Sequence, residues 1–147
     1  MPESEERLDE DAAVERLNAA LSLQMRSALQ YSLTASSAVG FEGQSLGEAL
    51  TRYGDHELAD ARRLISKIVA LGGTPTTEVA ELRVDRDLRS AVKWLVQCEQ
   101  DAVEALQQAI EPTGREARSE ALEHLLEHLI LRKQEQIDRL DRALAKP

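Results

Sequence analysis

The feature that most constrains the fold is a 14-residue segment without a helical pattern, GGTPTTEVAELRVD, at positions 72–85. It separates two long helical patterns, and a structureless loop of this length inside a compact domain needs a structural reason. Fully extended, the segment reaches about 45 Å at ~3.3 Å per residue, whereas a helix of about 26 residues is about 39 Å long. The segment can therefore return along a whole helix, and we expect the helices on either side of it to run parallel.

Four long helical patterns account for most of the chain, and they cover residues 11–37, 45–72, 87–110 and 115–144. Ser45, with a glutamate three residues later, has the spacing of a capping box, and Gly72 is typical of a helix end. A short Gly-containing turn joins the first two helices and Pro112-Thr113-Gly114 joins the last two, so each pair is antiparallel. We predict one all-α domain over residues 1–147, a four-helix bundle with a long crossover between helices two and three. Residues 1–8 are expected to form a disordered acidic tail.

The composition supports an all-α class and excludes several functions. The 147 residues include 22 Leu and 20 Ala, both strong helix formers, and only four aromatic residues. The net charge of −9 argues against a nucleic-acid partner, because nucleic-acid binders are basic. No apolar run is long enough to cross a bilayer, the acidic N-terminus lacks a signal-peptide core, and the lone Cys98 cannot form an intrachain disulfide. We therefore expect a cytoplasmic protein without a membrane or nucleic-acid partner.

Each helical pattern carries an apolar stripe, and each stripe is interrupted near its middle by polar residues. The interruptions are Gln24, Glu57 with Asp60, Glu99, and Lys133 with Gln136. Because the helices of such a bundle bring their midpoints to one height, we expect these six side chains to form one polar layer inside the Leu/Ala core. Buried polar groups are unfavourable unless they are paired or bind a metal, so this layer is the candidate functional site.

The spacing in the layer is that of a carboxylate metal centre. Di-iron bundles take one Glu from each of two helices and a Glu-x-x-His pair from each of the other two. In this chain Gln24 and Glu99 occupy the single positions, and the paired positions hold Glu57-x-x-Asp60 and Lys133-x-x-Gln136. The layer thus keeps three carboxylates but contains two amides, one cation and no histidine.

Four segments resemble the bacterioferritin branch of the ferritin-like superfamily: LNAALSLQMRSALQYSLTAS, HELADARRLISKIVALGGTP, CEQDAVEALQQAI and EQIDRLDRALA. The resemblance covers nearly the whole chain and implies the ferritin-like form of the four-helix bundle, with Tyr31 as its buried tyrosine. The family's ligands are replaced at Gln24 (Glu), Asp60 (His), Lys133 (bridging Glu) and Gln136 (His). Only Glu57 and Glu99 match. Leu58 stands where bacterioferritins have their haem-ligating Met, so we expect no haem.

Three interpretations of the layer remain open. It is an active ferroxidase centre, an ion-pair network in which the Lys133 ammonium replaces the metals and pairs with Glu57 and Glu99, or a single weak metal site. The weak site would hold iron or another divalent cation at Glu57, Asp60 and Glu99, because carboxylate oxygens suit hard cations. The formal charges of three carboxylates and one ammonium group sum to −2. A buried charge of this size must be neutralised by protonation, by access to solvent or by a bound cation. We favour the ion-pair network.

The resemblance implies a protein of iron homeostasis, for iron binding or storage support, that lacks a functional ferroxidase centre and has no catalytic residue. The alternative is a non-catalytic structural or interaction bundle that has lost metal chemistry; a repurposed carboxylate oxidase is disfavoured because the layer has no His.

His124 and His128 are four residues apart on one helix face and are expected to face solvent or a neighbouring subunit, with metal binding left open. His56 is expected at the surface, and Cys98 as a small buried hydrophobe.

The resemblance also bears on assembly. The sequence ends DRALAKP shortly after Leu144, without the fifth helix that lines the fourfold contacts of the family's 24-subunit shell. We therefore expect a homo-oligomer that is a homodimer rather than a closed shell. Its contact is expected on the outer faces of the first two helices, with Leu23 and Leu58 as candidates.

Overall fold

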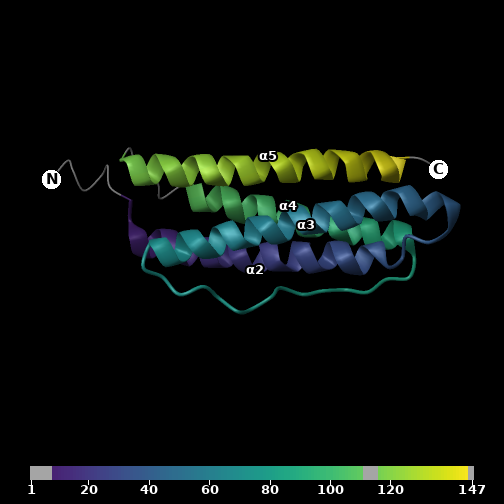
Figure 1. The fold of residues 1–147 in the computed structure, drawn as a ribbon, viewed down its shortest axis with the longest axis horizontal. Coiled ribbons are helices and arrows are strands. Elements are labelled where there is room, and N and C mark those ends of the chain that lie inside the picture. Colours follow the sequence, from purple (N-terminus) through teal and green to yellow (C-terminus); the bar gives the residue numbers. More distant parts are fainter. Residues whose placement is uncertain (1–7, 111–115, 146–147) are drawn as a thin grey trace.

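The computed structural model describes residues 8–110 and 116–145, and that part of the chain forms four helices. They are α2 (Glu10–Ala35), α3 (Gly40–Ala70), α4 (Leu88–Ile110) and α5 (Ala117–Ala145). α2 and α3 form one antiparallel hairpin, α4 and α5 form the other, and α3 and α4 run in the same direction (Figure 1). The predicted all-α bundle with parallel second and third helices is confirmed. The predicted turn at residues 112–114 lies outside the described residues.

The crossover between α3 and α4 follows the outer side of α2 along the bundle (Figure 1). The side chain of Asn18 donates to the carbonyl of Thr74 at 3.0 Å and accepts from the backbone N–H of Thr76 at 2.8 Å. Farther along α2, the side chain of Gln30 donates to the Arg83 carbonyl at 2.8 Å and accepts from the Arg83 N–H at 3.0 Å. α2 thus supplies hydrogen-bond partners for a backbone that has no helix or sheet of its own.

The crossover is also attached to α4. The guanidinium carbon of Arg83 lies 3.8 Å from the centroid of the Trp94 ring, a cation–π contact. Trp94 Nε1 donates to Gln30 Oε1 at 3.1 Å. Gln30 therefore connects α2, the crossover and α4 at one point, close to the end of the bundle where α4 begins.

Two helix starts differ from the sequence predictions. α3 begins at Gly40 rather than at Ser45, so the predicted capping box is wrong. The chain turns directly from α2 into α3 because Gly40 adopts a φ of 77°, a left-handed conformation that suits glycine. At the other end of α2, Asp9 caps the helix by accepting from the Ala12 N–H at 3.1 Å. Residues 1–7 of the predicted acidic tail lie outside the described residues, while Leu8 is buried in the core.

The core consists of two apolar clusters with a polar layer between them. One cluster contains Leu17, Leu21, Leu64, Ile68, Leu106, Leu122, Leu126 and Leu129. The other contains Tyr31, Leu50, Val92, Leu95, Ile137 and Leu140. None of the four helices in the described part of the chain combines the length and the apolar character that a bilayer crossing requires.

Candidate functional site

The polar layer is built by all four helices. Its predicted members are at most 3% exposed; they are Gln24, Glu57, Asp60, Glu99, Lys133 and Gln136. All of them except Asp60 belong to one hydrogen-bonded network. The prediction that the interrupted stripes meet at one height is therefore confirmed, and the arrangement of Asp60 differs from that of the other five.

Lys133 lies between the two glutamates. Its Nζ donates to Glu57 Oε2 at 2.7 Å and to Glu99 Oε1 at 2.9 Å, and all three side chains have no exposed surface. A protonated lysine has three donors and no lone pair. The two carboxylates are thus bridged by an ammonium group, and the predicted pairing of Lys133 with Glu57 and Glu99 is confirmed.

The two glutamines hold the carboxylates from either side. Gln136 Nε2 lies 2.8 Å from Glu57 Oε1 and 3.1 Å from Glu99 Oε2, and it donates to both carboxylates. Gln24 Nε2 donates to the Glu57 carbonyl at 2.9 Å and also to the Glu57 carboxylate. The amide oxygens of Gln24 and Gln136 are buried and have no hydrogen-bond partner among the described residues. Both glutamine side chains therefore act on the carboxylates as hydrogen-bond donors.

Tyr31 is a further member of the layer. Its hydroxyl donates to Glu99 Oε2 at 2.9 Å and accepts from Gln136 Nε2 at 3.1 Å. Burial, followed by the nearby charges of Glu99 and Glu57, raises the pKa of Tyr31 well above its usual value. The apolar stripe predicted that this ring is buried, but it gave no partner for the hydroxyl. The signal was the residue type, since a buried Tyr O–H usually requires a hydrogen-bond partner.

Asp60 is turned toward a different cation. Arg132 Nη1 lies 3.2 Å and 3.3 Å from the two carboxylate oxygens of Asp60. Arg132 is 26% exposed and lies off the apolar stripe of α5, so no periodic pattern pointed to it. Among residues 8–110 and 116–145, no three His, Cys, Asp or Glu side chains are arranged to hold a metal ion. The predicted set Glu57, Asp60 and Glu99 is thus split: Lys133 bridges the two glutamates, whereas Asp60 pairs with Arg132 and, at 3.9 Å, with Arg63.

The ionisation of the layer follows from this geometry. Burial and the neighbouring Glu99 charge raise the pKa of Glu57 to about 8, although Lys133 acts in the opposite direction. Burial also acts to raise the pKa of Glu99, but the Lys133 charge and several hydrogen bonds outweigh it and lower the pKa. Burial acts to lower the pKa of Lys133, yet the charges of Glu57 and Glu99 raise it above its usual value.

Nearby arginines account for the charge imbalance expected from the sequence. Arg132 Nη1 lies 3.2 Å from Asp60 Oδ1, and Arg63 Nη1 lies 3.9 Å from the same atom. Together with Lys133, three cations therefore face the three carboxylates, and their formal charges balance when all six groups are ionised. The raised pKa of Glu57, about 8, further favours the neutral form of that side chain. The −2 that the sequence indicated is thus offset by two arginines.

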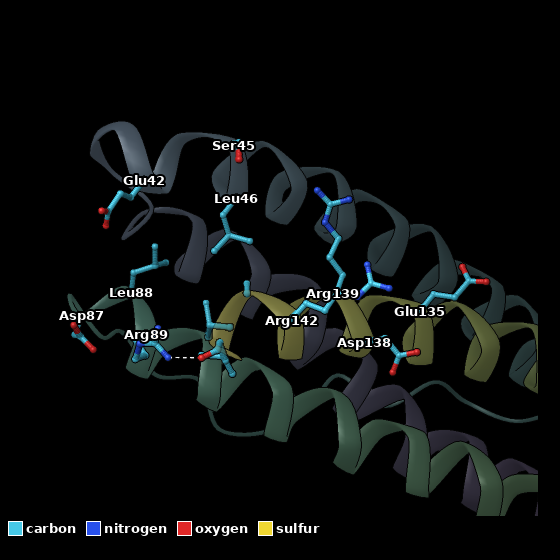
Figure 2. A pocket seen from close by; sticks show the side chains of 13 residues that line it. Glu42, Ser45, Leu46, Asp87, Leu88, Arg89, Glu135, Asp138, Arg139 and Arg142 are labelled. Carbon is cyan, nitrogen blue, oxygen red and sulfur yellow. Dashed lines mark hydrogen bonds between the residues drawn. The ribbon is translucent and has the colours of Figure 1, made fainter. Parts of the chain in front are cut away.

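The layer approaches the surface between α3 and α5, which contact each other far less than α2 contacts α3 or α4 contacts α5. A cavity of about 200 Å³ in this gap is lined by Tyr53, His56, Arg132, Glu135 and Gln136. Nearer the start of α3, the same gap widens into a cleft of about 1020 Å³. Figure 2 shows this cleft between α3, the start of α4 and the last turns of α5, with Leu46 on α3, Leu88 on α4, and Arg139 and Arg142 on α5. Gln136 is thus the member of the layer that borders an opening.

The other predicted residues lie outside the layer. His56, His124 and His128 are all exposed, as predicted. Cys98 is buried, also as predicted, and burial raises the pKa of its thiol to about 11.

The two leucines predicted for a subunit contact differ in exposure. Leu58 is 47% exposed on α3. Leu23, predicted to face outward with it, is instead partly buried against the core.

Comparisons with known proteins bear on the whole chain. The family model for the ferritin-like domain matches residues 14–147. A ferritin-like, diiron-carboxylate protein from Bacillus anthracis str. Ames superposes with a TM-score of 0.84 at 26% identity, over 92% of this chain and 97% of that chain. A Rhodobacter capsulatus bacterioferritin, described with a metal-free dinuclear site and heme iron, gives a TM-score of 0.81 at 21% identity, over 90% of this chain and 83% of that chain. No curated protein matches the chain.

Proposed function

This chain belongs to the ferritin-like family, and from that premise we propose a protein of iron homeostasis that lacks a functional ferroxidase centre and supports iron binding or storage. The observation that carries the proposal is the position of Lys133. Its ammonium bridges Glu57 and Glu99 at 2.7 Å and 2.9 Å. By the family resemblance, the same position would hold a glutamate that bridges two irons.

The residues present do not fit a pair of iron ions. A protonated lysine offers no lone pair and places a positive charge where two cations would have to bind. Gln136 donates its amide N–H groups to both glutamates, so it too takes up carboxylate oxygens that a metal would need. An ion at Glu57, Asp60 and Glu99 would have to displace both Lys133 and Arg132. We therefore expect any binding of iron or another divalent cation at these three residues to be weak.

Rapid mixing of the purified chain with Fe(II) in air tests this proposal. We expect no fast, stoichiometric oxidation and no diferric absorbance band. A positive control changes Gln24→Glu, Asp60→His, Lys133→Glu and Gln136→His together, which restores the donor types of a di-iron bundle. A diferric band in the unmodified chain, as strong as in the restored variant, would overturn the proposal.

A second candidate function is a structural or interaction bundle without metal chemistry. It is favoured by one observation, the three cations Lys133, Arg132 and Arg63 that face the three carboxylates, since their formal charges balance without a bound ion. Iron content after purification together with particle mass separates the two candidates. A dimer that contains no iron and takes up none favours the structural bundle, whereas iron uptake favours a role in storage.

We further propose that the chain forms a homodimer through the outer faces of α2 and α3. Leu29 on α2 and Leu58 on α3 support this contact, because they are 48% and 47% exposed. Burying such side chains against a second copy is favourable in proportion to the apolar area removed from water.

A further inference from the structure

We infer that the outer face of α5 carries a second site, in which His124 and His128 chelate a divalent transition-metal ion. Residues four positions apart on a helix are neighbours on its surface, and two histidines at this spacing form the helical half of many zinc sites. Both side chains are exposed, so an ion reaches them without any change in the core. Imidazole nitrogen suits Zn²⁺, Cu²⁺ and Ni²⁺, which defines the class of ligand.

The contacts of the two rings leave them able to bind. No hydrogen bond or ion pair among the described residues engages His124. The Nε2 atom of His128 lies 3.3 Å from Arg132 Nη2. A guanidinium has only donors, so a hydrogen bond at this contact uses the Nε2 lone pair that a metal ion would need.

The surrounding charge favours a cation. Glu120, Glu123 and Glu127 occupy the same two turns of α5 as the histidines. The positive group in contact with the pair is Arg132, and its guanidinium also contacts Asp60 at 3.2 Å. Arg132 is therefore a competitor for His128 Nε2 that the ion has to displace, and it can keep its contact with Asp60.

The site is limited to two protein ligands within one chain. No third His, Cys, Asp or Glu in the described ranges completes the coordination, so water must fill the other positions. We therefore expect an exchangeable ion rather than a structural one. The site shares Arg132 with the polar layer, through Asp60, whereas Lys133 and Gln136 are buried and the two histidines are exposed. A negative result for metal binding at His124 and His128 would not affect the proposed function, which depends on Lys133 and the two glutamates.

The chain has only three histidines, which makes a direct test possible. We expect the imidazole ¹⁵N resonances of His124 and His128 to shift on addition of one equivalent of Zn²⁺ to the full chain. The resonances of His56, an exposed histidine on α3, should stay in place. Resonances of His124 and His128 that do not respond to Zn²⁺, or that respond no more than those of His56, would overturn the inference.

Single substitutions test whether Zn²⁺ binds at His124 and His128 rather than at other exposed side chains. Partners that only orient a metal-bound histidine change affinity about 10–100-fold, so His124→Ala or His128→Ala should weaken Zn²⁺ binding by calorimetry at least tenfold. His56→Ala is the matched control and should leave the affinity unchanged. Arg132→Gln removes the competitor and should strengthen binding, with circular dichroism checking that this variant folds. Equal Zn²⁺ affinity in His124→Ala, His128→Ala and the unmodified chain would contradict the site.

Discussion

At the scale of single residues, Lys133 decides what the layer can do. Its apolar stem passes through the core, as long lysine side chains can, and its ammonium contacts both glutamates. Removing one partner of a buried ion pair leaves the other charge uncompensated, which is far less favourable than losing a surface pair. The layer should therefore depend on this one side chain for its stability as well as for its chemistry.

We predict that Lys133→Ala lowers the free energy of unfolding at neutral pH by about 3–5 kcal/mol. The pKa of Glu99 is lowered in the folded protein, so its contribution to stability is present above its usual value of 4.5 and is lost as pH falls. The effect of the substitution should therefore shrink below about pH 4.5. Urea unfolding at several pH values measures it. Lys93→Ala, at an exposed position on α4, is the control, and a Lys133→Ala chain as stable as the unmodified one would contradict the buried pair.

Glu57 gives the opposite pH dependence. Its pKa is about 8 when folded and 4.5 when unfolded, so the folded state holds a proton that the unfolded state releases between these values. The contribution of Glu57 to the free energy of unfolding is therefore fully present below pH 4.5 and is lost as the pH rises through 8. We predict that Glu57→Gln removes this decline, which amounts to at most about 1.4 kcal/mol per pH unit. Unfolding from pH 5 to 9 tests this, with exposed Glu48→Gln as control; an unchanged slope in Glu57→Gln would contradict the shift.

The sequence predicted which residues enter the layer, but only some of their contacts. A stripe with helical spacing reports the face on which a side chain lies, and this was enough for Gln24, Glu99 and Lys133. It does not report which neighbour the side chain contacts. The contact between Asp60 and Arg132 depends on the rotation and separation of α3 and α5, and these quantities have no signature in either helix alone.

At the scale of elements, the crossover is the part whose conformation depends on contacts with other elements. Its length predicted its path, because only a long segment can join two parallel helices. Its attachment was not predicted, since the partners lie far away in the sequence. Gln30 and Arg83 are 53 residues apart, and both backbone groups of Arg83 form hydrogen bonds with the same Gln30 amide.

The start of α3 was also not predicted. The turn before α3 depends on the positive φ of Gly40 rather than on a side-chain cap.

We predict that Gln30→Ala loosens the crossover from α2 and α4. The substitution leaves the Arg83 backbone groups and the Trp94 N–H without their partner, and each lost hydrogen bond typically lowers stability by about 1 kcal/mol. Trypsin should cleave after Arg83 faster than in the unmodified chain. Gln97→Ala removes an exposed glutamine side chain on α4 and serves as the control. Equal cleavage rates in Gln30→Ala and in the control would show that Gln30 does not hold the segment.

At the scale of the whole molecule, the proposed homodimer gives a prediction with a matched pair of variants. Light scattering should give twice the chain mass of 16.3 kDa. Leu58→Asp should shift the particle toward the monomer, because an unpaired charge in an apolar contact is unfavourable. Leu131→Asp makes the same change at a leucine that is 59% exposed on α5, and it should leave the dimer intact. A monomer, a shell of 24 chains, or equal effects of the two variants would contradict the proposed contact.

The polar layer between two leucine-rich clusters also fixes how the four helices align lengthwise. Leucine and alanine stripes alone would tolerate a helix that slides by one turn, about 5.4 Å, because one leucine can take the place of the next. Such a slip would move the Lys133 ammonium among leucines and leave Glu57 and Glu99 without their cation. A single buried polar position can set the register of packed helices in this way. The layer can therefore fix the lengthwise register of the four helices, a role that does not depend on whether it binds iron.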